Sequence, residues 1–82
     1  MFLTVDTEAR ATYVAVSSAP VSRTVSVSDA VMVDVDAMSQ PVGVEFLMLP
    51  ERITESLVAR VIEQFPTLEK LRDLDVWLRA SA

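Results

Sequence analysis

The chain lacks the residues on which much protein chemistry depends. It contains no cysteine and no histidine, only one glycine (Gly43) and only one lysine (Lys70). Without cysteine there is no disulfide, and without histidine a zinc site could be built only from carboxylates. The serines and threonines therefore have no activating base beyond a carboxylate, and one glycine cannot form a glycine-rich phosphate loop. The sequence predicts a protein that is not an enzyme and that uses no cofactor.

Long apolar runs and an excess of basic residues are also missing. No window approaches the roughly 20 apolar residues that a membrane-spanning helix needs. The segment from Met1 to Asp6 has neither the basic stretch nor the long apolar run of a secretory signal. A net charge of −5 disfavours binding to nucleic acid or to an anionic membrane surface. We therefore expect a cytoplasmic protein that binds neither nucleic acid nor membranes.

Apolar residues, by contrast, are abundant for so short a chain. Hydrophobic residues make up 51% of the 82 positions, and the mean hydropathy is +0.38. A domain of this size has little interior in which to bury them, and one small core supplies only about 3–5 kcal/mol. We expect a single domain over residues 1–82 that buries its remaining apolar surface by self-association as a homodimer.

In the first fifty residues, valine alternates with small polar residues in the two-residue period of a half-buried strand. The pattern predicts five strands, over residues 3–5, 11–17, 22–27, 31–35 and 42–48. Short connections between them predict an antiparallel meander in which the strands lie in sequence order. The residues expected on the inner face are Leu3, Val5, Val14, Val16, Val25, Val27, Val31, Val33, Val35, Val44 and Phe46.

After Pro50 the apolar residues recur at helical spacing. Thr54 is a candidate N-cap, and Pro66 prevents the first helix from continuing. The apolar face of this first helix consists of Leu57, Val58, Val61, Ile62 and Phe65. Thr67 can cap a second helix whose apolar stripe consists of Leu68, Leu71, Leu74 and Leu78. The predicted fold class is α+β: a five-stranded antiparallel meander over residues 1–50, with two C-terminal helices over residues 51–82 packed on one face.

The order and spacing of several residues in the first fifty positions form a more specific pattern. The matching residues are Asp6, Glu8, Ala9, Ala11, Tyr13, Val14, Val16 and Ser17, followed by Val31, Val33, Asp34, Asp36, Val42, Gly43, Val44, Glu45, Phe46 and Leu47. Over residues 1–50 the chain resembles the small, mainly bacterial family called domain of unknown function 2283. The family has no established activity, so the resemblance brings none to this chain. Some members of that family resemble the partner component of toxin–antitoxin pairs, which implies a binding role.

Two loops depart from the pattern of that family. The family has Asp-Gly before the fourth strand, where this chain has Asp29 and Ala30. The loop from Asp36 to Pro41 contains no glycine to supply a left-handed residue. Either the loop geometry differs from that of the family or the relationship is distant.

One acidic cluster could carry chemistry, and it consists of Asp34, Asp36 and Glu45. If the valines point inward, Asp34 and Glu45 lie on the outer face of neighbouring antiparallel strands, and Asp36 extends the row. Carboxylate oxygens suit Mg²⁺, Ca²⁺ or Mn²⁺, so the three residues are candidate metal ligands. Acidic residues on a solvent-facing sheet also keep the protein soluble and block edge pairing, and we consider this the stronger interpretation.

Two apolar patches remain outside the predicted core. Tyr13, Met32 and Leu47 share the outer sheet face, and aromatic and methionine side chains are enriched in interface cores. In the second helix, Trp77 and Val76 flank the stripe that contains Leu74 and Leu78. We expect these seven residues to supply interfaces, with the second helix as the preferred homodimer contact.

These observations leave two hypotheses for the function. The first is a non-enzymatic protein-interaction module, either an accessory bacterial or phage protein or an antitoxin-like partner. The alternative is a carboxylate-based divalent-metal-binding protein or hydrolase that uses Asp34, Asp36 and Glu45.

Overall fold

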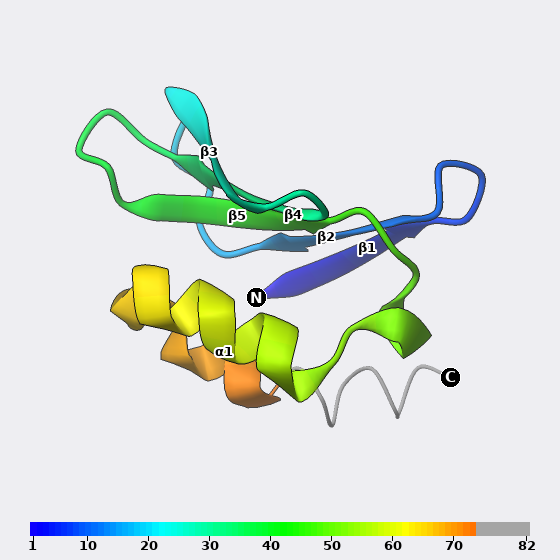
Figure 1. Cartoon of the computed structure of the whole chain (residues 1–82). Helices are drawn as coiled ribbons and strands as arrows, with labels where there is room; N and C mark the ends of the chain where they lie inside the picture. The colour runs from blue at the N-terminus through cyan, green and yellow to red at the C-terminus, as the bar shows by residue number, and fades with distance from the viewer. Residues whose placement is uncertain (74–82) are drawn as a thin grey trace.

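The computed structural model describes residues 1–73, and these form one antiparallel sheet with a helical layer on one side (Figure 1). The elements are β1 (Phe2–Asp6), β2 (Ala11–Ala15), β3 (Arg23–Ser28), β4 (Val31–Val35), β5 (Pro41–Phe46), the 3-10 helix η1 (Pro50–Arg52), α1 (Glu55–Gln64) and the 3-10 helix η2 (Pro66–Asp73). The five strands and the two longer helices confirm the predicted α+β class. No helix in residues 1–73 has the length and apolarity needed to cross a lipid bilayer.

The order of the strands differs from the predicted meander. The observed order is β1-β2-β5-β4-β3, so β2 pairs with β5 rather than with β3. The segment between β2 and β3, which contains Pro20, carries the chain past the ends of β5 and β4 to the far edge of the sheet. In a meander β5 would be an edge strand, with neighbours on one side only. The observed order places β5 in the centre, where Val42, Gly43, Val44 and Phe46 are all buried.

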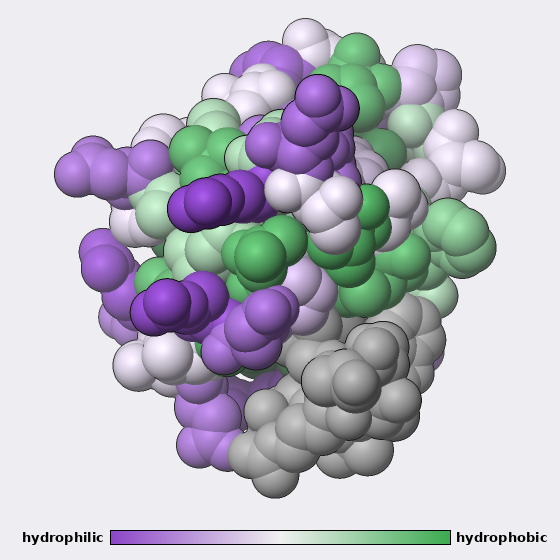
Figure 2. All heavy atoms as spheres, turned by 90° about the vertical axis from the view of Figure 1, so that its right-hand side faces the viewer, coloured by the Kyte–Doolittle hydropathy of each residue, from purple (hydrophilic) through white to green (hydrophobic). Residues whose placement is uncertain are grey.

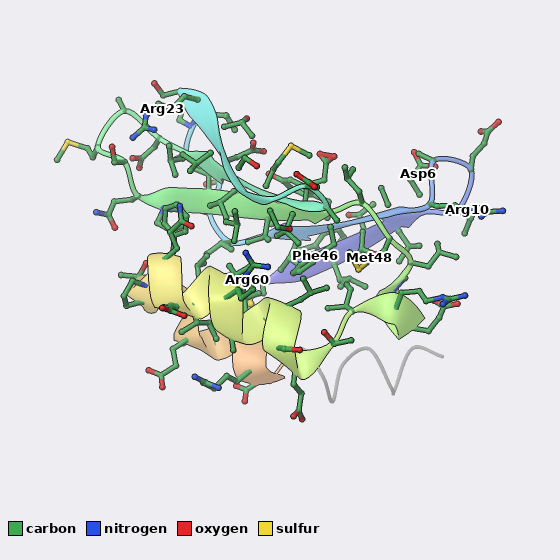
Figure 3. All side chains as sticks on the ribbon, in the orientation of Figure 1. Asp6, Arg10, Arg23, Phe46, Met48 and Arg60 are labelled. Atoms are coloured by element: carbon green, nitrogen blue, oxygen red, sulfur yellow. The ribbon has the colours of Figure 1, made fainter. Side chains whose placement is uncertain are left out.

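The valine face of the sheet forms half of the core. Its central row consists of the directly paired residues Leu3, Val14, Val44, Val33 and Val25. Val14, Val33 and Val44 have no exposed surface, and Phe46 points from β5 toward the helical layer (Figure 3). Val5 was predicted to lie in the core but is 38% exposed. The reason is that β1 is an edge strand with a neighbour on one side only.

The helical layer supplies the other half of the core. Thr54 caps α1 as predicted, because its hydroxyl accepts a hydrogen bond from the Leu57 amide at 3.3 Å. Val58, Val61 and Ile62 of α1 are buried in the same cluster as the sheet valines. In its described part, residues 66–73, the second helix is a 3-10 helix that begins at Pro66, before the Thr67 cap that we expected, and it is kinked at Leu68. It buries Leu68 and Leu71 of the predicted stripe, whereas Leu74 and Leu78 lie outside the described residues.

Aspartates close two turns, Asp6 at the end of β1 and Asp36 just after β4. Oδ1 of Asp6 accepts hydrogen bonds from the amides of Glu8 and Ala9, at 3.1 and 3.0 Å, which closes the predicted Asx-type turn. In the glycine-free loop after β4, Ser39 adopts a φ of 62°. A serine therefore occupies the left-handed conformation that glycine adopts most easily.

Candidate functional site

The outer face of the sheet, opposite α1 and η2, brings Tyr13, Asp34 and Glu45 together. Strand alternation places all three side chains on this face. Tyr13 on β2 lies directly opposite Glu45 on β5, and Glu45 lies opposite Met32 on β4. Asp34 is paired with Gly43, so Asp34 and Glu45 are diagonal neighbours across β4 and β5 rather than directly opposed.

Gly43 allows the Tyr13 ring to lie flat across the neighbouring strand. A β-carbon at position 43 would overlap the ring and the hydroxyl of Tyr13, so no other residue fits without displacing the ring. The ring in turn covers the glycine, which is buried even though it lies on the outer face. An aromatic side chain that covers a cross-strand glycine restores packing that the glycine cannot provide.

The hydroxyl of Tyr13 reaches beyond Gly43 to the next strand. It donates a hydrogen bond of 2.9 Å to Oδ2 of Asp34, and the Thr24 hydroxyl on β3 donates one of 2.7 Å to Oδ1. Tyr13, Gly43, Asp34 and Thr24 therefore connect four strands, and we call this group the Tyr13 bridge. Both carboxylate oxygens of Asp34 are used within it, so this carboxylate acts as a structural acceptor.

The surroundings of Tyr13 stabilise its neutral form. Burial, the hydrogen bond to Asp34 and the negative charges of Asp34 and Glu45 raise the pKa of Tyr13 from 10.0 to about 12. Each of these effects disfavours the phenolate, because that form would lose solvation, lose its donated proton and face two carboxylates. The Tyr13 hydroxyl therefore remains a hydrogen-bond donor at any physiological pH.

The predicted three-carboxylate metal cluster is not assembled on this face. Asp36 follows the end of β4, and its Oδ1 accepts hydrogen bonds from the amides of Met38 and Gln40 at 2.8 and 2.9 Å. It closes the loop instead of extending the row of Asp34 and Glu45. Within residues 1–73, no three acidic, histidine or cysteine residues lie close enough together to hold a metal ion.

The predicted interface residues fall into two groups. Tyr13 and Met32 are half-buried and flank Glu45, and Leu47, which directly follows β5, is 46% exposed. These three share the outer face as predicted, together with Phe2, which is 69% exposed. Leu74, Val76, Trp77 and Leu78 lie outside the described residues, so the homodimer contact expected there stays a prediction.

A separate hollow of about 370 Å³ lies between β3 and α1. Val27, Arg60, Glu63 and Gln64 line it. The three α1 residues are exposed, and their charges and amide face solvent. The lining contains no serine, threonine, cysteine or histidine, and its one carboxylate, Glu63, is exposed, so we assign no reaction to the hollow.

Sequence reasoning identified Tyr13, Met32, Asp34 and Glu45 but not the roles of Gly43 and Thr24. The glycine was informative, because a lone glycine in a strand often marks a close approach by another group. Identifying that group required the pairing of β2 with β5, which the predicted meander did not contain.

Replacing Gly43 tests the Tyr13 bridge. In the wild-type background, Gly43→Ala should destabilise the protein by about 1–3 kcal/mol, because the new methyl group displaces the Tyr13 ring. In a Tyr13→Ala background the same substitution should stabilise it by about 0.5–1 kcal/mol, because a strand glycine is then replaced without a clash. Urea unfolding of the four variants measures both effects. Tyr13→Phe is the control, since it keeps the ring and should keep Gly43→Ala destabilising. The same sign in the wild-type and Tyr13→Ala backgrounds would contradict the bridge.

Titration of the single tyrosine tests its electrostatic surroundings. The ultraviolet absorbance of the phenolate should appear with a midpoint near pH 12 instead of 10.0. Asp34→Asn should lower this pKa but not fully restore it, because burial continues to disfavour the phenolate. Since folding raises the pKa, the stabilising contribution of the neutral hydroxyl is complete below about pH 10 and is lost as the pH rises through about 12. A midpoint near 10 in the folded protein would show that the hydroxyl is solvated and free of Asp34.

Comparison with known proteins adds no assignment to this geometry. No family model matches the chain, and no curated protein or solved structure matches it either.

Proposed function

We propose that the protein is a non-enzymatic protein-interaction module that binds a partner through the outer face of its sheet. The observation that carries this proposal is the Tyr13 ring, held across Gly43 by its hydrogen bond to Asp34. An aromatic side chain that is already immobilised loses little conformational entropy when a partner covers it. Met32 beside Glu45, and the exposed Phe2 and Leu47, add apolar contact area on the same face.

The charge of this face indicates a basic partner. Residues 1–50 carry six carboxylate side chains but only two cationic ones, Arg10 and Arg23. These arginines lie at opposite ends of the sheet (Figure 3), and the guanidinium of Arg23 donates a hydrogen bond of 2.8 Å to the Ser39 hydroxyl. A partner segment with arginine or lysine next to an apolar residue complements such a surface and is attracted to it over a distance.

Kinship with the domain of unknown function 2283 family remains part of the proposal. Tyr13, Asp34, Gly43 and Glu45 are among the residues that match the family pattern, and these four residues come from three strands to meet on one face. With this resemblance, the proposed role is that of an accessory bacterial or phage protein, or of an antitoxin-like partner. The metal-dependent alternative receives no comparable support, because Asp36 closes a loop and Asp34 serves the Tyr13 bridge.

Charge reversal on the outer face tests the proposed function. The full chain, immobilised, is used to capture proteins from a lysate of its source organism, and the captured protein is then purified for affinity measurement. Glu45→Lys should weaken binding at least about tenfold, or about 1.4 kcal/mol, and added salt should weaken wild-type binding. The matched control is Glu63→Lys, which makes the same change at an exposed position on α1 and should leave the affinity unchanged.

Two results would contradict this assignment. Equal binding by Glu45→Lys and the wild type would remove the outer face as the binding surface. A rise in melting temperature with millimolar Mg²⁺, Ca²⁺ or Mn²⁺ that Glu45→Gln abolishes would instead support the metal-binding alternative.

A further inference from the structure

The two edges of the sheet differ in how well they are protected against pairing with another strand. β3, at one edge, contains a register irregularity between Ser26 and Ser28. Four of its six residues are polar or charged: Arg23, Thr24, Ser26 and Ser28. Bulges and polar or charged side chains are the usual devices by which proteins block edge-to-edge association.

β1, at the other edge, is less protected: it has no bulge, and its only charged residue, Asp6, lies at its end and accepts hydrogen bonds within its own turn. Its five residues pair with β2 in an uninterrupted register, and they include no proline and no lysine. Phe2, Leu3 and Val5 make it mostly apolar, and Phe2 and Val5 are 69% and 38% exposed. An apolar, regular and exposed edge strand is a template for a further strand.

The direction of the unpaired backbone groups on β1 follows from hydrogen bonds elsewhere in the sheet. The Val16 amide donates to the Val42 carbonyl at 2.8 Å, so Val16 directs its amide toward β5. Because this direction alternates along an antiparallel strand, Val14 and Thr12 also face β5, whereas Ala15, Tyr13 and Ala11 face β1. The bond from the Leu47 amide to the Ala30 carbonyl, at 2.8 Å, independently gives the same alternation on β5.

The partners on β1 can now be assigned. Phe2, Thr4 and Asp6 lie opposite Ala15, Tyr13 and Ala11, so their amide and carbonyl groups bond to β2. Leu3 and Val5 therefore direct their amide and carbonyl groups to the open edge of the sheet. Among the described residues, none outside β2 forms a backbone hydrogen bond with β1.

We propose that two copies of this chain associate by antiparallel pairing of β1 with β1 across a two-fold axis. The inference goes beyond the proposed function and does not require that the outer face binds a partner. In the register centred on Thr4, Leu3 of each copy lies opposite Val5 of the other. Both residues direct their amides and carbonyls outward, so the two pairs form four hydrogen bonds, and the two Thr4 side chains face each other at the axis.

The side chains of β1 are complementary to themselves in this register. Leu3 and Val5 lie on the inner face, so each cross-strand contact continues the apolar row that contains Val14 and Val44. Asp6 lies opposite Phe2 of the second copy, so no like charges meet. Its carboxylate already accepts bonds from the amides of Glu8 and Ala9 in its own turn. This self-complementarity favours a second copy over an unrelated strand, because a two-fold axis uses the same patch twice.

The resulting assembly is a continuous ten-stranded sheet. A two-fold axis perpendicular to the sheet keeps both helical layers on one side, and it joins the two outer faces into a single surface with two Tyr13 bridges. Pairing of five-residue strands buries a small area, below about 1,200 Å², so the association belongs to the weak class of interfaces.

The test uses the full-length protein and combines sedimentation with residue-resolved hydrogen exchange at low and high micromolar concentrations. The wild type should form dimers, and the Leu3 and Val5 amides should exchange slowly only in the dimer. Thr4→Lys places two like charges at the axis and should raise the dissociation constant at least about tenfold, or about 1.4 kcal/mol. Ser26→Lys is the matched control, since Ser26 occupies the other end of the same cross-strand row, on β3, and should leave the dissociation constant unchanged.

Slow exchange of the amide at position 4 in Thr4→Lys shows that the variant retains the β1–β2 ladder.

Three results would overturn the inference. One is a wild-type monomer at every concentration. Another is a dimer in which Leu3 and Val5 exchange freely or which Thr4→Lys does not weaken. The third is slow exchange of Leu3 and Val5 in the monomer, which would show that another part of the same chain covers the β1 edge.

Discussion

The rest of the structure depends on the burial of one apolar sheet face beneath the helical layer. A five-stranded sheet with exposed valines on one side would aggregate, and α1 and η2 remove that face from water. Because both helices lie on the same side (Figure 1), the other face and the β1 edge remain available in the described part of the chain. Viewed from the end of the sheet that carries the β1–β2 turn, hydrophobic residues lie among hydrophilic ones (Figure 2). One face of the sheet thus forms the core, whereas in residues 1–73 the outer face and the β1 edge are not covered by another element.

The central contact of the outer face is that between Gly43 and the ring of Tyr13. Gly43 provides the space, the Tyr13 ring fills it, and Asp34 fixes the ring through its hydroxyl. The hydrogen bond from Thr24 extends the connection to β3. Side chains therefore link β2 to β4, two strands that do not pair through their backbones. Both oxygens of Asp34 are engaged in this connection, so that carboxylate serves to position the Tyr13 ring.

The sequence predicted which side of the sheet each residue faces better than it predicted which strands are neighbours. The two-residue period placed Val14, Val33 and Val44 inside and Tyr13 outside, because alternation is a local property of a strand. Strand order depends on long-range contacts, and short connections favoured a meander. The burial of four of the six β5 residues follows from its central position, which periodicity alone does not reveal. The contacts of Gly43 and the loop-closing role of Asp36 required the pairing and the loop geometry themselves.

The helices cover the valine face and leave Tyr13 fixed over Gly43 on the opposite face. Nuclear Overhauser effects from the Tyr13 ring test this arrangement, since this is the only tyrosine in the chain. We expect strong effects to the α-protons of Gly43, an upfield ring-current shift of one of those protons, and no effect to the methyl groups of Val61 or Leu71. Effects from the Tyr13 ring to those buried helix methyls, or unshifted Gly43 α-protons, would contradict it.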